Sequence, residues 1–124
     1  MARVRSLSGK SDFRITYEKG VKRVGRLLVV YMMVTDEDQM AVVASKKIGD
    51  AVRRNRAKRL LREALRREVF ADADQVRRIR NRIHPTRNPK ASGAEGLRIV
   101  AIARAGIRSA SCREVCEDLH RILS

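Results

Sequence analysis

The chain has 124 residues, the length of one compact domain that can bury a core without disulfide bonds or metal ions. Its longest uninterrupted apolar run, Leu27 to Val34, is too short to cross a bilayer, which argues against a transmembrane protein. Lys and Arg number 29 against 14 Asp and Glu, and the formal net charge of +15 indicates an anionic partner, above all a nucleic acid. Residues 1–25 contain no apolar stretch typical of a signal peptide, so we expect the chain to stay in the reducing compartment where it is made.

A short helix is expected near the N-terminus. Ser11 is suited to cap this helix and Gly20 is suited to end it. Phe13 and Tyr17, which are four residues apart, would then share one helical face.

Two strands are predicted to follow. Residues 26–34 are rich in Val, Leu and Met, and residues 40–45 form a second, shorter apolar run. Because the polar residues 35–39 between them favour a turn, we expect the two strands to pair as a hairpin.

A long helix is predicted from Asp50, its N-terminal cap, to about Glu68. Its apolar residues repeat at helical spacing and predict a core face of Ala57, Leu60, Leu61, Ala64 and Leu65. At 100° per residue, a polar face falls on the opposite side, with Asn55, Arg59, Arg62 and Arg66. Arg53 and Arg54 point roughly toward the core but cannot be buried unpaired, so the first turn should overhang the core.

The remainder of the chain divides into three parts. Residues 70–96 are irregular and predict a basic insertion or loop, in which Val76, Ile79 and Ile83 could mark a short helix. Leu97 to Ala103 predicts a strand. The last helix has a capping box, Ser111 with Glu114, and an apolar stripe formed by Cys112, Val115, Cys116, Leu119, Ile122 and Leu123.

Residues suited to catalysis are hard to find. His84 and His120 have no Cys partner at the spacing of metal ligands, and Cys112 and Cys116 are better explained as core thiols of the last helix. The chain has no phosphate-binding glycine loop and no nucleophile elbow. Two acidic pairs could in principle hold Mg²⁺, but both stand beside turns or helix starts, where Asp is common: Asp36 with Asp38 and Asp72 with Asp74. We expect no catalytic residue and no metal ligand in this chain.

The charge is concentrated in residues 46–67, which hold ten basic and two acidic side chains. A run of charges is usually a solvated helix face. Here Glu63 is the single acid between Arg59 and Arg67, so the ion pairs that stabilise ordinary exposed helices are largely missing. Arg predominates over Lys in the helix, and its planar guanidinium suits forked contacts with phosphate.

Three of the four aromatic side chains lie in the first quarter of the chain, namely Phe13, Tyr17 and Tyr31. Packing in the core is the commonest role of such residues. A platform that stacks on unpaired bases is the functional alternative. The residues themselves leave these two interpretations nearly even.

Residues 45–63 read Ser-Lys-Lys-Ile-Gly-Asp-Ala-Val-Arg-Arg-Asn-Arg-Ala-Lys-Arg-Leu-Leu-Arg-Glu. This run resembles the signature of the protein subunit of bacterial ribonuclease P. Asp12 and Phe13 with Tyr17 resemble the family's first helix, and Tyr31 falls at its aromatic strand position. Residues 99–104 resemble the last strand of the family, so the likeness covers most of the chain except residues 70–96.

The resemblance implies an α/β (α+β) fold, a single-domain two-layer sandwich in the order helix, strands, long helix, strand, helix. The basic helix would lie in a left-handed βαβ crossover, against the general rule for such connections. Residues 1–124 would form one RNA-binding domain with a basic insertion at about 70–96.

The resemblance also implies the residues that contact RNA. The catalytic RNA would face the basic helix and the loop before it, through Lys46, Lys47, Arg53, Arg54, Asn55, Arg56, Lys58, Arg59, Arg62 and Arg66. The single-stranded 5′ leader of precursor tRNA would lie in a cleft lined by Phe13, Tyr17 and Tyr31. Three positions depart from the family pattern: Thr16 replaces a branched apolar residue, Asp50 an Asn or similar residue, and Arg53 a residue that is commonly apolar.

The function implied is that of the protein cofactor of ribonuclease P, the endonuclease that removes the 5′ leader from precursor tRNA in the bacterial cytoplasm. Its Mg²⁺ would be bound mainly by the RNA subunit, and neither an organic cofactor nor a membrane would be involved. A ribosomal or ribosome-associated RNA-binding protein without a role in catalysis is the alternative. A DNA-binding module is a weaker one, because neither a helix-turn-helix nor zinc-ligand spacing supports it.

Overall fold

The computed structural model describes residues 4–83, 88–89 and 96–124. A five-stranded sheet forms its centre, in the order β1-β4-β5-β3-β2. The strands are β1 (Arg5–Ser6), β2 (Val21–Val24), β3 (Leu28–Thr35), β4 (Gln39–Val43) and β5 (Gly96–Ala103). The α-helices are α1 (Lys10–Lys19), α2 (Ala51–Leu65), α3 (Ala73–Arg82) and α4 (Cys112–Leu123). Three shorter helical segments are η1 (Lys46–Ile48), η2 (Arg66–Phe70) and η3 (Ala105–Ser109).

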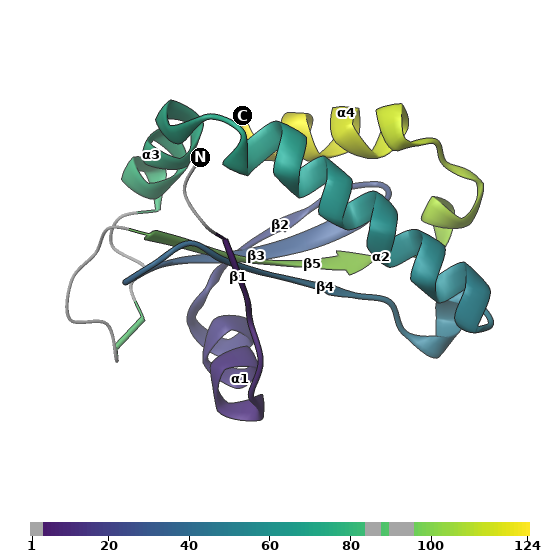
Figure 1. Cartoon of the computed structure of the whole chain (residues 1–124), viewed down its shortest axis with the longest axis horizontal. Coiled ribbons are helices and arrows are strands. Elements are labelled where there is room, and N and C mark those ends of the chain that lie inside the picture. The colour runs from purple at the N-terminus through teal and green to yellow at the C-terminus, as the bar shows by residue number, and fades with distance from the viewer. Residues whose placement is uncertain (1–3, 84–87, 90–95) are drawn as a thin grey trace.

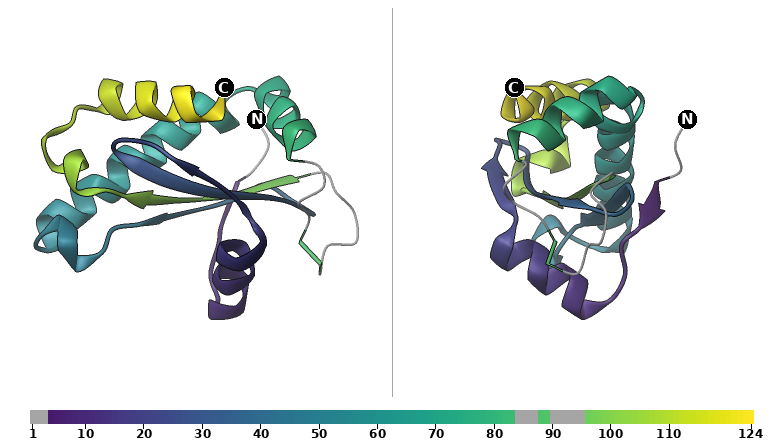
Figure 2. Two further views of the ribbon diagram at one scale, coloured as in Figure 1. Left: turned by 180° about the vertical axis from the view of Figure 1, so that it is seen from behind. Right: turned by 90° about the vertical axis from the view of Figure 1, so that its left-hand side faces the viewer.

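Helices cover the two faces of the sheet unequally. The three helices α2, α3 and α4 lie together on one face, and α1 lies alone on the other (Figures 1 and 2). The sheet and the larger group of helices form the two layers that were expected, with the main apolar core between them. The short α1 leaves much of the opposite sheet face without a covering helix (Figure 1).

The predicted hairpin is wrong. β3 and β4 are consecutive in the chain, but β5 lies between them, antiparallel to β3 and parallel to β4. Turn-forming residues predict only that the chain reverses its direction locally. The position of β5 between β3 and β4 depends on pairing between residues that are far apart in the chain. The partner of β3 in a true hairpin is β2, which was not predicted because it is short, carries two basic residues and is mostly exposed.

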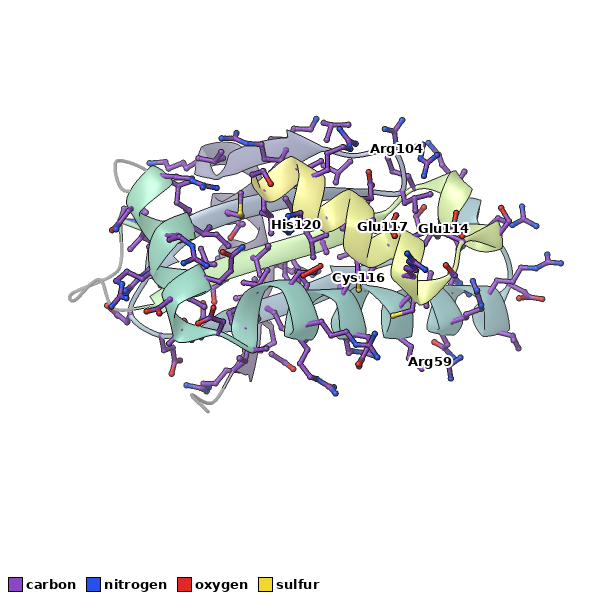
Figure 3. The ribbon with its side chains drawn as sticks, turned by 90° about the horizontal axis from the view of Figure 1, so that it is seen from above. Arg59, Arg104, Glu114, Cys116, Glu117 and His120 are labelled. Carbon is purple, nitrogen blue, oxygen red and sulfur yellow. The ribbon has the colours of Figure 1, made fainter. Side chains whose placement is uncertain are left out.

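The connection from β4 through α2 to β5 joins two neighbouring parallel strands. Viewed from the helical side, it has the left-handed sense that the resemblance implied (Figure 3). Most crossovers of this kind are right-handed. This topology places the basic helix α2 beside the edge of the sheet formed by β4 and β1 (Figures 1 and 3).

The long helix follows its predicted pattern. The side chain of Asp50 accepts a hydrogen bond from the backbone amide of Arg53 at 3.0 Å, and therefore caps α2 as expected. The predicted core face is confirmed: Leu60 is partly buried, and the other four residues are buried, namely Ala57, Leu61, Ala64 and Leu65. Val52, in the first turn, is 77% exposed, so this end of the helix does overhang the core.

The start of α1 differs from the prediction. Gly9, and not Ser11, is the N-terminal cap residue, and its φ of 96° is a conformation that glycine adopts without a steric penalty. Ser11 is the second residue of the helix and is exposed. Gly20 ends the helix as predicted, with its amide bonded to the carbonyl of Thr16 at 2.8 Å.

The basic insertion is only partly irregular. Residues 73–82 form α3, and the three apolar residues that hinted at a helix are buried in the core: Val76, Ile79 and Ile83. The prediction of a basic insertion or loop was therefore incomplete, because part of this segment is a helix packed on the core. Residues 84–87 and 90–95, including His84, lie outside the described residues. No helix in the described part of the chain is long and apolar enough to span a membrane.

Candidate nucleic-acid interface

The outer face of α2 carries a ridge of cations. Asn55, Arg59, Arg62 and Arg66 are all exposed, which confirms the predicted polar face. Arg53 is also exposed, in the first turn of the helix, which overhangs the core. Arg59 projects from α2 on the side away from α4 (Figure 3). Within the described residues, Arg53, Arg59 and Arg62 form no ion pair, so their charges are available to an external anion. We call exposed Arg53, Arg59 and Arg62, together with Lys46 and Lys47, the basic ridge.

Two lysines extend the ridge beyond the first turn of α2. Lys46 and Lys47 are exposed in η1, while Ile48 is buried and anchors this segment. Gly49 joins η1 to α2 with a φ of 135°, a conformation that other residues rarely adopt. The glycine of the Ser-Lys-Lys-Ile-Gly sequence thus turns the chain so that both lysines stand next to the start of the basic helix.

Arg56 has a different environment from the ridge. Its guanidinium donates hydrogen bonds to the carbonyl oxygens of Ile107 at 3.3 Å, Arg108 at 3.4 Å and Ala110 at 2.7 Å. These bonds hold η3 and the residue after it against α2. Arg56 was expected to face RNA, but the structure uses its donors within the protein.

The other predicted RNA-binding arginines and lysine are neither as free as the basic ridge nor as fully engaged within the protein as Arg56. Arg54 and Lys58 are half-buried on α2. Arg66 lies 3.3 Å from the carboxylate of Glu63, which also accepts a hydrogen bond from Arg67 at 2.9 Å. The far end of α2 is therefore less strongly positive than its beginning.

The structure brings the three predicted aromatic side chains together. The ring centroids of Phe13 and Tyr17 are 6.1 Å apart, and those of Tyr17 and Tyr31 are 5.0 Å apart in an edge-to-face arrangement. Tyr17 is 38% exposed, and the other two residues are half-buried. Burial, followed by the effect of Tyr31, raises the pKa of Tyr17. These residues are thus neither fully buried nor free in solvent, and we call them the aromatic cluster.

The sheet face beside this cluster is apolar and incompletely covered. Val29, Ile102 and Val43 pair in register across β3, β5 and β4, and each is only partly buried. They are two positions along their strands from the row that contains Tyr31, and therefore face the same side. A partly exposed apolar surface therefore extends along the sheet from the aromatic cluster.

Lys22 is a neighbour of the cluster that the sequence did not identify. Its ammonium lies 5.8 Å from the centre of the Tyr31 ring, within the range of a cation–π contact. Lys22 is exposed in β2, opposite Tyr31 in the antiparallel pair. Recognising the β2–β3 hairpin from the residues between Gly20 and Gly25 would have placed this lysine beside Tyr31.

A small cavity connects the aromatic cluster with the basic ridge. It has a volume of about 180 Å³ at the edge formed by β1 and β4, and both Phe13 of α1 and Arg62 of α2 line it. The two predicted binding surfaces, which lie on opposite sides of the sheet, therefore meet at this edge.

The two cysteines of α4 are poorly suited to act as nucleophiles. Burial, followed by the effect of Cys112, raises the pKa of Cys116 to about 11, which disfavours the reactive thiolate. Cys116 is buried and Cys112 is packed against the core, as predicted for core thiols. In the part of the chain that the structure describes, no three His, Cys, Asp or Glu side chains form a group that could hold a metal ion.

Comparisons with known proteins identify related sequences and structures. The family model described as Ribonuclease P matches residues 1–124. The chain is 28% identical over 123 residues to a ribonuclease P protein component of Clostridioides difficile, covering 98% of this chain and 90% of that protein. It is 45% identical over 64 residues to the corresponding protein of Coprothermobacter proteolyticus, of which it spans 54%, with 52% of this chain aligned.

Solved structures show the same fold. The RNase P protein of Staphylococcus aureus matches with a TM-score of 0.67 at 24% identity, covering 98% of this chain and 94% of that one. The RNase P protein of Thermotoga maritima matches with a TM-score of 0.66 at 24% identity, covering 98% and 96%. The sequence match over the whole chain, supported by this shared fold, shows that the chain belongs to the ribonuclease P protein component family.

Proposed function

We propose that this chain is the protein cofactor of a ribonucleoprotein endonuclease that removes the 5′ leader from precursor tRNA. Family membership supports a role in ribonuclease P. The observation that carries the finer proposal is the meeting of two surfaces at one edge of the sheet. One surface is a ridge of cations without ion pairs among the described residues, and the other is a partly exposed aromatic cluster.

The basic ridge suits the phosphates of the catalytic RNA. Exposed Lys and Arg side chains gain binding free energy by neutralising phosphates and releasing counterions. Arg59 and Arg62 are one helical turn apart on α2, and Lys46 and Lys47 extend the same positive surface past its N-terminus. Arg56, by contrast, is assigned to holding η3 in place.

The aromatic cluster suits the unpaired leader of the substrate. Bases stack on aromatic rings without strong sequence preference, and nearby cations can contact the intervening phosphates. The half-exposed Tyr17 ring, the Tyr31 ring and the apolar row beside them offer such a surface, with Lys22 next to Tyr31. Mature tRNA lacks the leader and would not use this surface.

The hydrolytic step is assigned to the RNA subunit, which would bind Mg²⁺ for it. This protein would contribute substrate affinity and positive charge, act in the bacterial cytoplasm, and use no organic cofactor. Its described acidic residues do not gather into a metal-binding group, so none of them is assigned as a ligand.

Reconstitution tests this proposal. The purified protein should allow a bacterial ribonuclease P RNA to cleave precursor tRNA at the correct 5′ site at low Mg²⁺, where the RNA alone is inactive. A protein that binds this RNA but leaves the Mg²⁺ requirement of cleavage unchanged would contradict the proposal. That result would favour the alternative of a ribosome-associated RNA-binding protein.

A further inference from the structure

Arg98 is an arginine buried between α1 and the sheet. It stands near the start of β5 and is 2% exposed. Its Nε donates to Oε1 of Gln39 at 2.8 Å, and its Nη1 donates to Oγ1 of Thr16 at 3.2 Å. The Sδ of Met33 lies 3.6 Å from the same Nη1, and a carboxylate oxygen of Asp12 lies 4.0 Å from Nη2. One side chain therefore joins three strands and α1.

The strand register explains why these partners converge. Arg98 pairs with Met33 of β3 on one side and with Gln39 of β4 on the other, so the three side chains form a row on the face covered by α1. Thr16 of α1 is fully buried over this row. Its hydroxyl donates to the carbonyl of Asp12 at 2.7 Å and uses its oxygen to accept from Arg98.

The next row on the same face includes Tyr31. It pairs with Val100, which is two residues after Arg98 in β5. Consecutive rows on one face are about 6.6 to 6.8 Å apart along a strand. On α1, Tyr17 directly follows Thr16, and its ring meets that of Tyr31. The helix is thus anchored one row away from the place where the two tyrosine rings touch.

We propose that Arg98 is a positioning residue for single-stranded RNA, which holds α1 in one register over the sheet so that Tyr17 and Tyr31 keep the spacing needed to stack on unpaired bases. This inference rests on the proposed function of the aromatic cluster. It also accounts for the fully buried Thr16, because the buried guanidinium needs an oxygen acceptor at that position.

A purely apolar contact would hold α1 less specifically. Apolar side chains can slide or repack at little cost, whereas hydrogen bonds to a rigid guanidinium fork have fixed directions. Burial lowers the pKa of Arg98 and the carboxylate of Asp12 opposes that shift, so Asp12 helps to keep the guanidinium charged. Replacing both buried partners by apolar side chains of similar size is often nearly neutral for stability. Stability and positioning can therefore be separated by mutation.

The first experiment observes the rings directly in the free protein. The chain has two tyrosines and no tryptophan, so 3-fluorotyrosine labelling gives one ¹⁹F resonance for Tyr17 and one for Tyr31. In the double variant Arg98→Met with Thr16→Val, we expect the Tyr17 resonance to shift and broaden. The control Arg113→Met removes an exposed arginine of α4 and should leave both resonances unchanged.

The second experiment measures binding by the holoenzyme assembled with a bacterial ribonuclease P RNA. The readout is the ratio of the Kd for mature tRNA to the Kd for precursor tRNA. We expect this ratio to fall by at least about fivefold in the double variant, the equivalent of one weak base stack. The Kd for mature tRNA and the melting temperature should stay close to those of the Arg113→Met control.

The outcomes separate this inference from the proposed function. If Tyr17→Ala lowers the ratio but the double variant does not, the leader site stands and the role of Arg98 is wrong. If Tyr17→Ala leaves the ratio unchanged, the leader site itself is wrong and the inference fails with it. If the double variant does not fold, Arg98→Lys takes its place, because lysine keeps the charge but lacks the planar fork. An unchanged ratio of the two Kd values in Arg98→Lys would overturn the inference.

Discussion

The guanidinium of Arg56 donates to the backbone carbonyl of Ala110 at 2.7 Å, joining residues 54 positions apart in the chain. The basic helix thus contains one arginine that serves the fold among several that face solvent. Arg59, one turn away, has no such contact with the described residues and projects outward (Figure 3). The pair allows the structural and RNA-binding roles of arginine to be compared on a single helix.

Arg56→Ala should lower the free energy of unfolding by about 1 to 3 kcal/mol, because three carbonyl oxygens lose a charged donor. Arg59→Ala should change stability by less than about 0.5 kcal/mol but weaken binding to the ribonuclease P RNA. Urea denaturation and RNA-binding isotherms of both variants provide the measurement. Equal stability of the two variants would show that the contact with η3 contributes nothing to the fold.

Binding to the RNA subunit should depend steeply on salt. If the five side chains of the basic ridge neutralise about 5 phosphates, a plot of log K against log salt concentration should have a slope of about −4. Removing two contacts, in Arg59→Ala with Arg62→Ala, should reduce the slope to about −2. Binding constants measured at several KCl concentrations test this, and a slope near zero for the unmodified protein would exclude the ridge as a phosphate-binding surface.

Leu61→Ala should act on stability and not on RNA contacts. Leu61 is fully buried on the inner face of α2, and truncating such a side chain costs about 2 to 5 kcal/mol. Arg62→Ala, at the neighbouring exposed position, is the matched control and should melt close to the unmodified protein. Thermal melts of the two variants distinguish the buried face of α2 from its exposed face. A lower melting temperature for Arg62→Ala than for Leu61→Ala would mean that the opposite face of α2 packs on the core.

Asp118 is expected to make the stability of the fold depend on pH in the acidic range. Burial alone would raise the pKa of Asp118, but hydrogen bonds from the amide of Leu27 at 2.8 Å, from Arg121 at 2.8 Å and from the amide of Arg26 at 3.2 Å outweigh it, and the net shift is downward. Its contribution to stability is therefore complete above its unfolded-state pKa of about 4 and is lost as the pH falls through the lower folded value.

Asp118→Asn should consequently be less stable than the unmodified protein at pH 7, by about 1 to 3 kcal/mol, and should lose less further stability between about pH 4 and pH 2. Urea titrations across this range measure both effects. Parallel pH profiles for the two proteins would show that the carboxylate is not responsible for the acid response.

Features encoded by local spacing could be predicted from the sequence. The core and polar faces of α2, the Asp50 cap and the capping box of α4 depend on residues within two helical turns, and all three are present. The hairpin between β3 and β4 failed because sheet order depends on β5, which lies more than fifty positions further along the chain.

The site was predictable to a different degree in each of its parts. Phe13 and Tyr17 share a helical face by spacing alone, whereas their contact with Tyr31 depends on how α1 packs on the sheet. Arg98 was missed because an arginine among apolar strand residues suggests a solvent-facing position, and only the placement of α1 buries it. Charge alone likewise could not separate Arg56 from Arg59.

The central claim is that the aromatic cluster binds the unpaired leader, and paired dissociation constants test it most directly. Holoenzymes containing Tyr17→Ala or Tyr31→Ala should bind precursor tRNA more weakly by about 1 to 3 kcal/mol per lost stack, while their affinity for mature tRNA stays unchanged. A thermal melt of each variant accompanies the binding data. Equal losses of affinity for both RNAs, together with a lower melting temperature, would contradict the account and assign the three aromatic residues to the core.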